Sequence, residues 1–306
     1  MSDPRRTYGR NTVELSKLDK VLFPADGLTK GDLIDYYEGV YDVTSPHLEN
    51  RPLTLQRFPD GIGNDGFYQK ETPDYFPDWI DRARIDVKGG GSQEQVLCNK
   101  KATLVYLANQ ACITPHIWLS RADRIERPDR MIFDLDPPGD DFGPVRTAAR
   151  RFRDLLRDLE LEPHLMLTGS SGAHVVVPLR REAEFDEVRK FAQLAADTLA
   201  RRHPDDLTTE QRKAKRGDRV FLDTARNAYG QTAVAPYSVR ARDGAPVATP
   251  IDWDELGDSD MHPQRYTIRN LNRRLAQRDD PWAHINRHAV GVGALRESLE
   301  RLRKEE

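Results

Sequence analysis

Residues 130–137 read RMIFDLDP, and this stretch decides both the fold and the site of the chain. Side chains of a strand alternate between two faces, so Asp134 and Asp136 share a face with Ile132 while the residues between them enter the core. Adjacent carboxylates repel each other unless a cation lies between them, and Mg²⁺ and Mn²⁺ prefer oxygen ligands. The stretch therefore predicts a divalent-metal site.

A third carboxylate, Asp223, ends a second such strand at residues 219–223 (RVFLD). Two carboxylates on one strand and a third on a neighbour can hold two metal ions for phosphoryl or nucleotidyl transfer. One ion would activate a 3′-hydroxyl and the other would neutralise the leaving pyrophosphate. The alternative, that these are ordinary strand-end aspartates, stays open, and more so for Asp223 than for the pair.

Composition restricts the function only loosely. The 306 residues include 47 Lys and Arg against 50 Asp and Glu, so net charge argues neither for nor against nucleic acid. No apolar run approaches the length of a membrane span and the N-terminus lacks a hydrophobic signal core, so we expect a cytoplasmic, nucleoid-associated protein. Cys98 and Cys112 are isolated and are predicted to be reduced core thiols, with a disulfide as the alternative.

Hydrophobic periodicity predicts an α+β fold. A helix is expected at residues 28–41, where Thr29 and Asp32 form a capping-box pattern, and another at 104–112. Residues 51–105 are typical of a hairpin-rich β region. We divide the chain into an N-terminal lobe at 1–125, a catalytic lobe at 126–256 and a C-terminal helical segment at 257–306. In the second half, strands are expected at 164–168, 174–179, 219–223 and 232–239, with helices at 145–159 and 185–202.

A glycine-rich turn follows the acidic strand. Residues 168–174 read TGSSGAH, and the backbone N–H groups and hydroxyls of such a turn can cradle phosphate oxygens, with His174 as a further donor. A plain glycine-rich hairpin with a satisfied histidine is the default alternative. Basic residues gather around Asp223, as a triphosphate requires, although charge runs usually form solvated faces. They are Lys213, Lys215, Arg216, Arg219, Arg226, Arg240 and Arg242.

Two features upstream are typical of nucleic-acid binding. Lys17, Lys20 and Lys30 lie near the predicted start of the first helix, where an anion site is plausible, although a solvated surface explains them equally well. Phe67 and Tyr68 could stack on bases, although such pairs more often belong to a core.

The order of these motifs resembles the polymerase domain of bacterial ligase D, a branch of the archaeo-eukaryotic primase superfamily that includes stand-alone actinobacterial primase-polymerases. The resemblance runs from about residue 15 to residue 256. It implies an RRM-like antiparallel sheet with helices, packed against an N-terminal α/β lobe that carries a DNA-binding surface. The six motifs are LDKVLFP (18–24), RFPDG (57–61), DLDP (134–137), GSSGAH (169–174), VFLD (220–223) and VAPYSVR (234–240).

The resemblance also implies roles for single residues. Asp134, Asp136 and Asp223 match the catalytic metal ligands. The matches to the nucleotide site are His116 near the sugar, Ser170 and His174 against the nucleotide, and Arg216 and Arg240 at the triphosphate. Lys20 and Lys30 match a pocket for the 5′-phosphate downstream of a gap or break, and Phe67 and Tyr68 match an aromatic pair that stacks on template bases.

Four positions depart from the family pattern. Ser171 stands where a lysine is usual, which removes a cation from the nucleotide site, while Arg226 replaces a glutamine, so we expect Arg226 to supply the missing charge. Lys17 replaces an asparagine of the 5′-phosphate pocket and should preserve or strengthen anion binding. Gln56 replaces a common lysine, which leaves that DNA contact in doubt.

We predict a template-dependent nucleotidyltransferase that extends primer 3′ ends with Mn²⁺ or Mg²⁺, preferring ribonucleotides. Gap filling or end processing in DNA repair, including non-homologous end joining, is the expected setting. The expected partners are gapped or broken duplex DNA, NTPs and dNTPs, and a separate ligase or end-binding protein, because the polymerase pattern already occupies the chain; no membrane partner is expected. The alternatives are a non-catalytic nucleic-acid-binding module and an Asp-x-Asp metal phosphatase, although Pro137 and Pro138 do not fit the latter.

Overall fold

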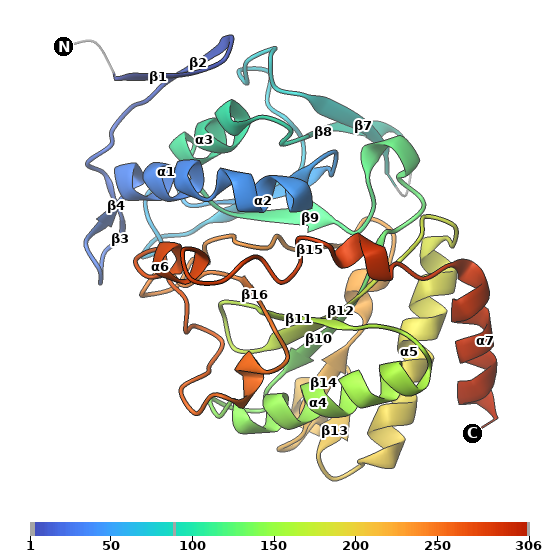
Figure 1. Ribbon diagram of the computed structural model, residues 1–306. Helices are drawn as coiled ribbons and strands as arrows, with labels where there is room; N and C mark the ends of the chain where they lie inside the picture. The colour runs from blue at the N-terminus through green and yellow to red at the C-terminus, as the bar shows by residue number, and fades with distance from the viewer. Residues whose placement is uncertain (1–3, 88–89, 305–306) are drawn as a thin grey trace. The chain divides into compact units, whose positions relative to one another are not determined.

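The computed structural model describes residues 4–87 and 90–304, and the chain forms two compact units (Figure 1). Unit 1 comprises Met1–Trp118, Thr232–Ala248 and Tyr266–Asp279. Unit 2 comprises Leu119–Gln231, Thr249–Arg265 and Asp280–Glu306. The two units therefore interleave along the chain, whereas the three functional segments expected from the sequence follow one another.

Unit 1 combines helices with a four-stranded sheet of order β15-β9-β5-β6, in which β6 is an edge strand. These strands are β15 (Thr232–Val234), β9 (Cys112–Trp118), β5 (Leu53–Arg57) and β6 (Phe67–Gln69). The helices are α1 (Lys30–Gly39), α2 (Tyr41–Leu48), α3 (Lys101–Asn109) and α6 (Leu271–Leu275). Three two-stranded ribbons complete the unit: β1 (Arg5–Tyr8) with β2 (Asn11–Glu14), β3 (Val21–Phe23) with β4 (Leu28–Thr29), and β7 (Arg82–Asp86) with β8 (Ser92–Val96).

The start of α1 confirms the predicted capping box, because Thr29 accepts a hydrogen bond from the Asp32 backbone N–H and the Asp32 carboxylate accepts one from Thr29 N. The predicted span of 28–41 is wrong at its start, since residues 28–29 pair with β3 as a strand. The helix predicted at 104–112 lies at Lys101–Asn109, and Cys112 already begins β9.

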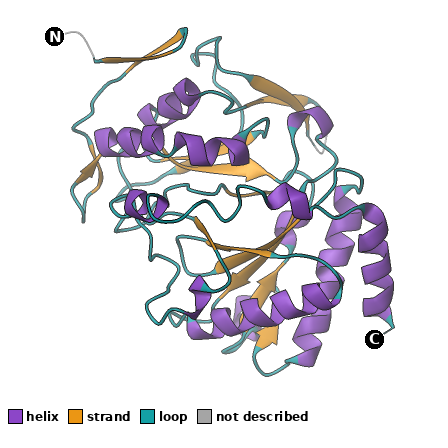
Figure 2. Cartoon of the chain, in the orientation of Figure 1, coloured by secondary structure: helices purple, strands orange, loops and turns teal. Residues whose placement is uncertain are grey.

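Unit 2 is built on a six-stranded sheet of order β13-β14-β10-β12-β11-β16. All its pairs are antiparallel except β13 with β14. Helices α4 (Gly143–Asp158) and α5 (Phe185–Arg202) pack on this sheet, and α7 (Val292–Arg303) packs on α5 (Figure 2). The strands are β13 (Leu207–Thr208), β14 (Val220–Asp223), β10 (Arg130–Asp136), β12 (Ala173–Pro178), β11 (His164–Leu167) and β16 (Thr249–Ile251).

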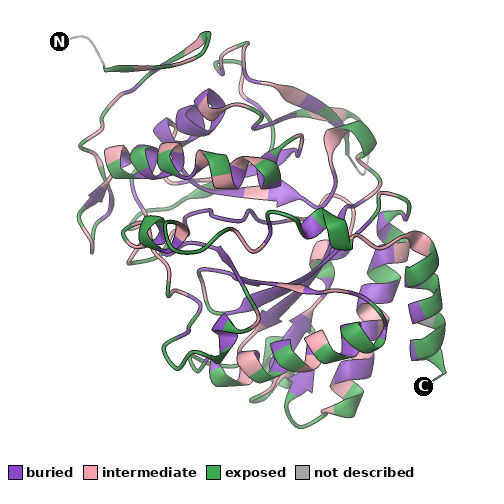
Figure 3. Cartoon of the chain, viewed as in Figure 1, coloured by how far each residue is buried: buried purple, intermediate pink, exposed green. Residues whose placement is uncertain are grey.

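The central strand β10 alternates as the sequence predicts. Met131, Phe133 and Leu135 are fully buried, and the Phe133 ring lies 4.3 Å from that of Phe152 in α4. This burial fixes which residues of β10 face the core, because a shift by one residue would turn the carboxylates inward. Figure 3 shows the strands of this sheet as largely buried.

Cys98 and Cys112 are both buried free thiols, as predicted, and burial raises the pKa of each. Within the described part of the chain, no helix combines the length and the apolar character needed to cross a membrane.

Candidate metal centre

The three predicted carboxylates come together on one face of the unit 2 sheet. In the antiparallel pairing of β10 with β14, Asp134 lies directly opposite Asp223, and Asp136 lies two residues further along β10. Opposite residues of antiparallel strands point to the same face. One carboxylate oxygen of each residue lies within 4.8 Å of the other two. The pairing register of β10 with β14 therefore brings the three carboxylates together.

The electrostatics of the cluster favour a bound cation. Burial, and after it the charges of Asp134 and Asp223, raise the pKa of Asp136 to about 6. Ionising all three carboxylates at neutral pH is therefore costly unless positive charge is added. Oxygen ligands that repel one another at this spacing fit a hard divalent ion such as Mg²⁺ or Mn²⁺.

Two basic side chains lie beside Asp134. His174 of β12 is its neighbour on the other side of β10, with Nε2 3.4 Å from Asp134 Oδ1. Arg226 Nε lies 3.7 Å from Asp134 Oδ2. His174 is buried, and its Nδ1 has no hydrogen-bond partner among the described residues. A buried nitrogen of this kind needs a ligand group as its partner.

The glycine-rich turn lies directly against the acidic strand. A Cβ at Gly172 would lie 2.0 Å from the carbonyl oxygen of Leu135, so only glycine permits this approach. Gly169 has a φ of 65°, which also favours glycine. Thr168 Oγ1 accepts the N–H groups of Ser170 and Gly172, each at 3.3 Å, and thereby orders the turn.

The two serine hydroxyls of the turn are accessible to a ligand, and the Arg216 guanidinium is held in place by its own contacts. Ser170 is half-buried and Ser171 is exposed. The Arg216 guanidinium stacks 3.5 Å from the centre of the Phe221 ring and donates to the carbonyls of Glu210 and Gln211. Its charge lowers the pKa of Asp136, against the larger effects of burial and the other carboxylates.

Asn227 is a residue that sequence reasoning missed. It is fully buried, its Oδ1 accepts from Ile132 N at 2.9 Å, and its Nδ2 donates to Ile132 O at 2.7 Å. The side-chain amide thus continues the pairing of β10 beyond Asp223, the last residue of β14. Thr224 Oγ1 also donates to Gln193 of α5. No sequence signal distinguished Asn227 from an ordinary polar loop residue.

The remaining predicted site residues belong to unit 1. His116 lies on β9, with its ring 5.6 Å from that of Tyr68. Arg240 donates its backbone N–H to Pro246. Phe67 and Tyr68 are both exposed on β6. Their parts in nucleotide and template binding stay predictions.

Backbone hydrogen bonds link the three lysines that the sequence predicts to bind a 5′-phosphate, Lys17, Lys20 and Lys30. Lys30 N donates to Lys20 O, and Lys20 N donates to Lys17 O. Lys20 Nζ lies 2.6 Å from Asp60 Oδ1, which lowers the pKa of that carboxyl. The Lys30 ammonium is buried and donates to Ser16 Oγ and Asn109 O. Lys17 and Lys20 are the more accessible of the three, and the part of these lysines in binding a 5′-phosphate stays a prediction.

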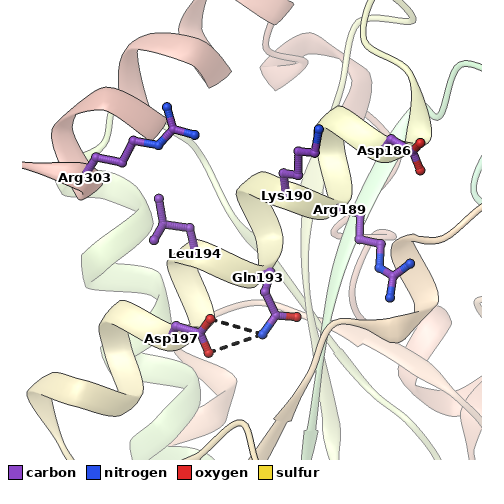
Figure 4. A pocket seen from close by; sticks show the side chains of 7 residues that line it. All are labelled: Asp186, Arg189, Lys190, Gln193, Leu194, Asp197 and Arg303. Atoms are coloured by element: carbon purple, nitrogen blue, oxygen red, sulfur yellow. Dashed lines mark hydrogen bonds between the residues drawn. The ribbon is translucent and has the colours of Figure 1, made fainter. Parts of the chain in front are cut away.

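A cavity of about 560 Å³ lies elsewhere in unit 2, beside α5 and α7 (Figure 4). Gln193 in its wall donates to Asp197 and accepts from Thr224, so the wall touches the loop that follows Asp223. None of the three clustered carboxylates lines it, and its charged groups are of both signs. Its lining residues are Asp186, Arg189, Lys190, Gln193, Leu194, Asp197 and Arg303. The metal centre is therefore assigned from the carboxylate geometry and not from the cavity.

A family model described as the primase-polymerase domain of LigD matches residues 29–282. The chain belongs to this family. This LigD primase-polymerase domain is 34% identical over 257 residues to the multifunctional non-homologous end joining protein LigD of Mycolicibacterium smegmatis, covering 83% of this chain and 34% of that protein. It is 33% identical over 278 residues to the bifunctional LigD of Bacillus subtilis, covering 90% and 44%. The chain thus spans less than half the length of these curated relatives.

A solved structure agrees with the family assignment. The polymerase domain of Mycobacterium tuberculosis ligase D, in complex with DNA, matches with a TM-score of 0.84 and 30% identity, over 90% of this chain and 99% of that one. The predicted family and the primase-like α+β fold are confirmed. The nucleotidyltransferase class is confirmed at the level of the family. The metal phosphatase alternative is set aside.

The raised pKa of Asp136 gives a pH-dependent prediction for the metal-free protein. At a pH below 3.8, the pKa of the unfolded chain, such a carboxyl contributes its full stability. This contribution is lost as the pH rises through the folded-state pKa of about 6. In EDTA at about pH 7.5, Asp136→Asn should therefore be more stable than the wild type by up to ~3 kcal/mol, and the difference should shrink towards about pH 4.

Urea unfolding of both proteins across this pH range measures the difference, with exposed Asp158→Asn as the control. Saturating Mn²⁺ should remove the advantage of the variant. Equal stability of Asp136→Asn and wild type throughout the range would show that the cluster carries no electrostatic cost.

Asn227 should be required to position the metal ligands. Asn227→Ala leaves the N–H and C=O of Ile132 without partners, at about 1–3 kcal/mol for each buried group, and should weaken Mn²⁺ binding about tenfold.

Thr114→Val is a matched control, because it removes a buried hydroxyl that donates to Val239 O at 2.6 Å in unit 1. Urea unfolding and Mn²⁺ titration followed by electron paramagnetic resonance separate stability from metal affinity. Unchanged Mn²⁺ affinity in folded Asn227→Ala would leave Asn227 a purely structural role.

Proposed function

We propose that this chain is a template-dependent nucleotidyltransferase that extends primer 3′ ends on gapped or broken DNA and prefers ribonucleotides. The observation that carries the proposal is the cluster of Asp134, Asp136 and Asp223 beside a glycine-rich turn, in a chain of the LigD primase-polymerase family. Non-homologous end joining is the proposed setting, since the curated relatives carry that name. A ligase and an end-binding protein are the proposed partners that would complete a repair.

The three carboxylates would hold Mn²⁺ or Mg²⁺. When bound, two such ions would activate the primer 3′-hydroxyl and stabilise the charge of the leaving pyrophosphate. The protein contributes a fixed ligand set, because Asp134 and Asp223 are opposed by strand register and Ala225 N donates to Asp223 Oδ1 at 2.7 Å. Fixed ligands need little reorganisation during the reaction.

The glycine-rich turn would bind the triphosphate. Ser170 and Ser171 offer hydroxyl donors, and Thr168 holds the backbone of the turn in place. In its imidazolium form His174 would donate from Nε2 towards Asp134 and from Nδ1 to a phosphate oxygen. These groups would orient the α-phosphate for attack.

Three arginines would neutralise the triphosphate in place of the missing turn lysine. Arg216 is held by its stacking on Phe221 and by two backbone carbonyls, so little entropy is lost when it binds. Arg226 contacts Asp134 and would turn to phosphate once Asp134 has a cation as its partner. Arg240 would add a third charge, and His116 would lie near the sugar.

DNA binding is proposed for residues 1–125, with nucleotidyl transfer at 126–256 and residues 257–306 as a C-terminal helical segment. Lys17, Lys20 and Lys30 would bind the downstream 5′-phosphate, because backbone hydrogen bonds bring these residues together at the N-terminus of α1. Phe67 and Tyr68 would stack on template bases. Gln56 of β5 lies opposite Tyr68 of β6. It offers a neutral amide to the DNA, where a lysine would offer a positive charge.

Primer extension tests the proposed activity. The wild type should extend a gapped duplex in Mn²⁺ with a higher kcat/KM for NTPs than for dNTPs. Asp223→Asn should lower kcat about a thousandfold, since a lost metal ligand costs several kcal/mol in the chemical step. DNA affinity, measured by fluorescence anisotropy, should be unchanged.

Exposed Asp158→Asn is the matched control and should extend normally. Near-normal extension by Asp223→Asn would reject the metal assignment. A wild type that binds DNA but never extends it would favour the non-catalytic nucleic-acid-binding module, and a preference for dNTPs would reject the proposed sugar selectivity.

The Lys20–Asp60 pair gives a two-sided test of the 5′-phosphate pocket. Lys20→Gln should reduce the preference for phosphorylated over unphosphorylated gaps about tenfold, the usual worth of a charge-assisted hydrogen bond. Asp60→Asn should raise that preference, because it removes the carboxylate that competes with phosphate for Lys20. Anisotropy titrations with both gapped duplexes measure it, and Asp65→Asn serves as a control. Opposite signs support the pocket, whereas equal behaviour of all four proteins rejects it.

A further inference from the structure

Exposed aromatic rings gather in one short segment of unit 1. Among the described residues, the large hydrophobic side chains that are exposed are Val21, Phe67, Tyr68, Tyr75 and Val87. All three aromatic members lie within residues 67–75, with exposed fractions of 46%, 61% and 62% in sequence order. Leaving three rings in water is costly, so a shared function explains the group better than chance.

Phe67 and Tyr68 do not form a single surface, because successive residues of a strand point to opposite faces. Phe67 lies opposite Arg57 and shares its face, with the Arg57 guanidinium 5.5 Å from the ring centre. Tyr68 lies opposite Gln56 on the other face of β6, where its ring contacts His116. One base cannot stack on both rings.

Tyr75 shares the Arg57 guanidinium with Phe67. Arg57 Nη1 donates to Tyr75 Oη at 2.9 Å and to Gln69 Oε1 at 2.6 Å. The Tyr75 ring also packs edge-on against the buried Phe76 at 5.2 Å, which fixes its position. Phe67 and Tyr75 are therefore two exposed rings tied to one cation.

The charge of Arg57 has no carboxylate partner among the described residues. Arg57 as a whole residue is only 8% exposed, and its guanidinium also donates to Gln110 O at 2.9 Å and to Gln110 Oε1 at 3.3 Å. All its acceptors are neutral. A buried cation usually has an anionic partner, and one that is hydrogen-bonded only to neutral groups attracts an anion from outside. Next to two exposed rings, the ligand that supplies both an anion and an aromatic face is a nucleotide of single-stranded DNA.

We propose that Phe67, Tyr75 and Arg57 form a second stacking site, which binds one unpaired base and its phosphate in single-stranded DNA. Tyr68 and His116 serve a different base on the opposite face of β6. The site rests on the proposed function, since it supposes a DNA substrate with an unpaired strand. It assigns to Tyr75 a contact with DNA, and it assigns Phe67 and Tyr68 to different bases.

An abasic-site scan of a 3′-overhang duplex tests the site. Binding is measured by fluorescence anisotropy while single bases of the overhang are removed one at a time. In the wild type, loss of the stacked base should weaken binding about tenfold. Tyr75→Leu should bind the intact overhang about tenfold less well and should no longer respond at that position. Tyr75→Phe keeps the ring and should bind nearly as well as the wild type, and Tyr68→Leu should become insensitive at a different position.

Tyr41→Leu is the matched control, because it removes a half-buried tyrosine of unit 1 whose hydroxyl donates to Asn99 O, and it should respond like the wild type. The Arg57 contact is tested through the DNA, because replacing a buried arginine can unfold the protein. A neutral methylphosphonate next to the stacked base should weaken binding.

Three results overturn the site. They are wild-type binding by Tyr75→Leu, insensitivity of Tyr75→Leu and Tyr68→Leu at the same base, and indifference to every methylphosphonate. A wild type that extends primers while showing any of these results rejects the stacking site alone. A wild type that neither binds nor extends DNA rejects the proposed function itself.

Discussion

The repulsion among three carboxylates on adjacent strands is the constraint on which the rest of unit 2 depends. Burial first, and then repulsion from Asp134 and Asp223, raise the pKa of Asp136 from 3.8 to about 6, which corresponds to about 3 kcal/mol against its ionisation. Full burial of one large apolar side chain contributes about 1.5–3 kcal/mol. The buried alternate residues of β10, Met131, Phe133 and Leu135, can thus offset this cost while they fix the register that creates it. A strand with a weaker core face would relieve the repulsion by slipping or fraying, and the metal ligands would separate.

Backbone contacts extend this register to the neighbouring loops. Gly172 brings the glycine-rich turn against Leu135, and Asn227 pairs with Ile132, so the groups on both sides of β10 are held by the same strand. In the proposed function, arginines fixed in other ways would replace the cation that the turn lacks at Ser171, above all Arg216, which is held on the Phe221 ring. Arg226 is different, since it contacts Asp134 directly and can balance the cluster when no metal is bound. Under the proposed function, a charge moved from the turn to this loop would couple metal binding to triphosphate binding.

Patterns confined to one element were predictable from the sequence, whereas contacts across the chain were not. The helix expected at 185–202 has those bounds in α5, and Met131, Phe133 and Leu135 of β10 are fully buried as predicted, although Ile132 and Asp134 on the other face are buried too. The strand expected at 232–239 ends at Val234, because Tyr237 turns to a φ of 64° while its ring is fully buried. Asn227 escaped notice because its partner Ile132 lies 95 residues away, and nothing in a local window marks such a pair. The metal cluster could be predicted from the sequence because two of its members share one strand.

Strand geometry limits what a sequence motif can say about binding. Phe67 and Tyr68 are adjacent in the sequence, and a motif treats them as one aromatic pair, yet alternation turns their rings to opposite faces of an edge strand. The Phe67 ring lies beside the Arg57 guanidinium, which also donates a hydrogen bond to Tyr75. Because β6 is an edge strand, both of its faces and its free edge can meet a ligand. An edge strand with a ring on each face can hold two bases apart, which suits a strand of DNA that must be unstacked before it is copied.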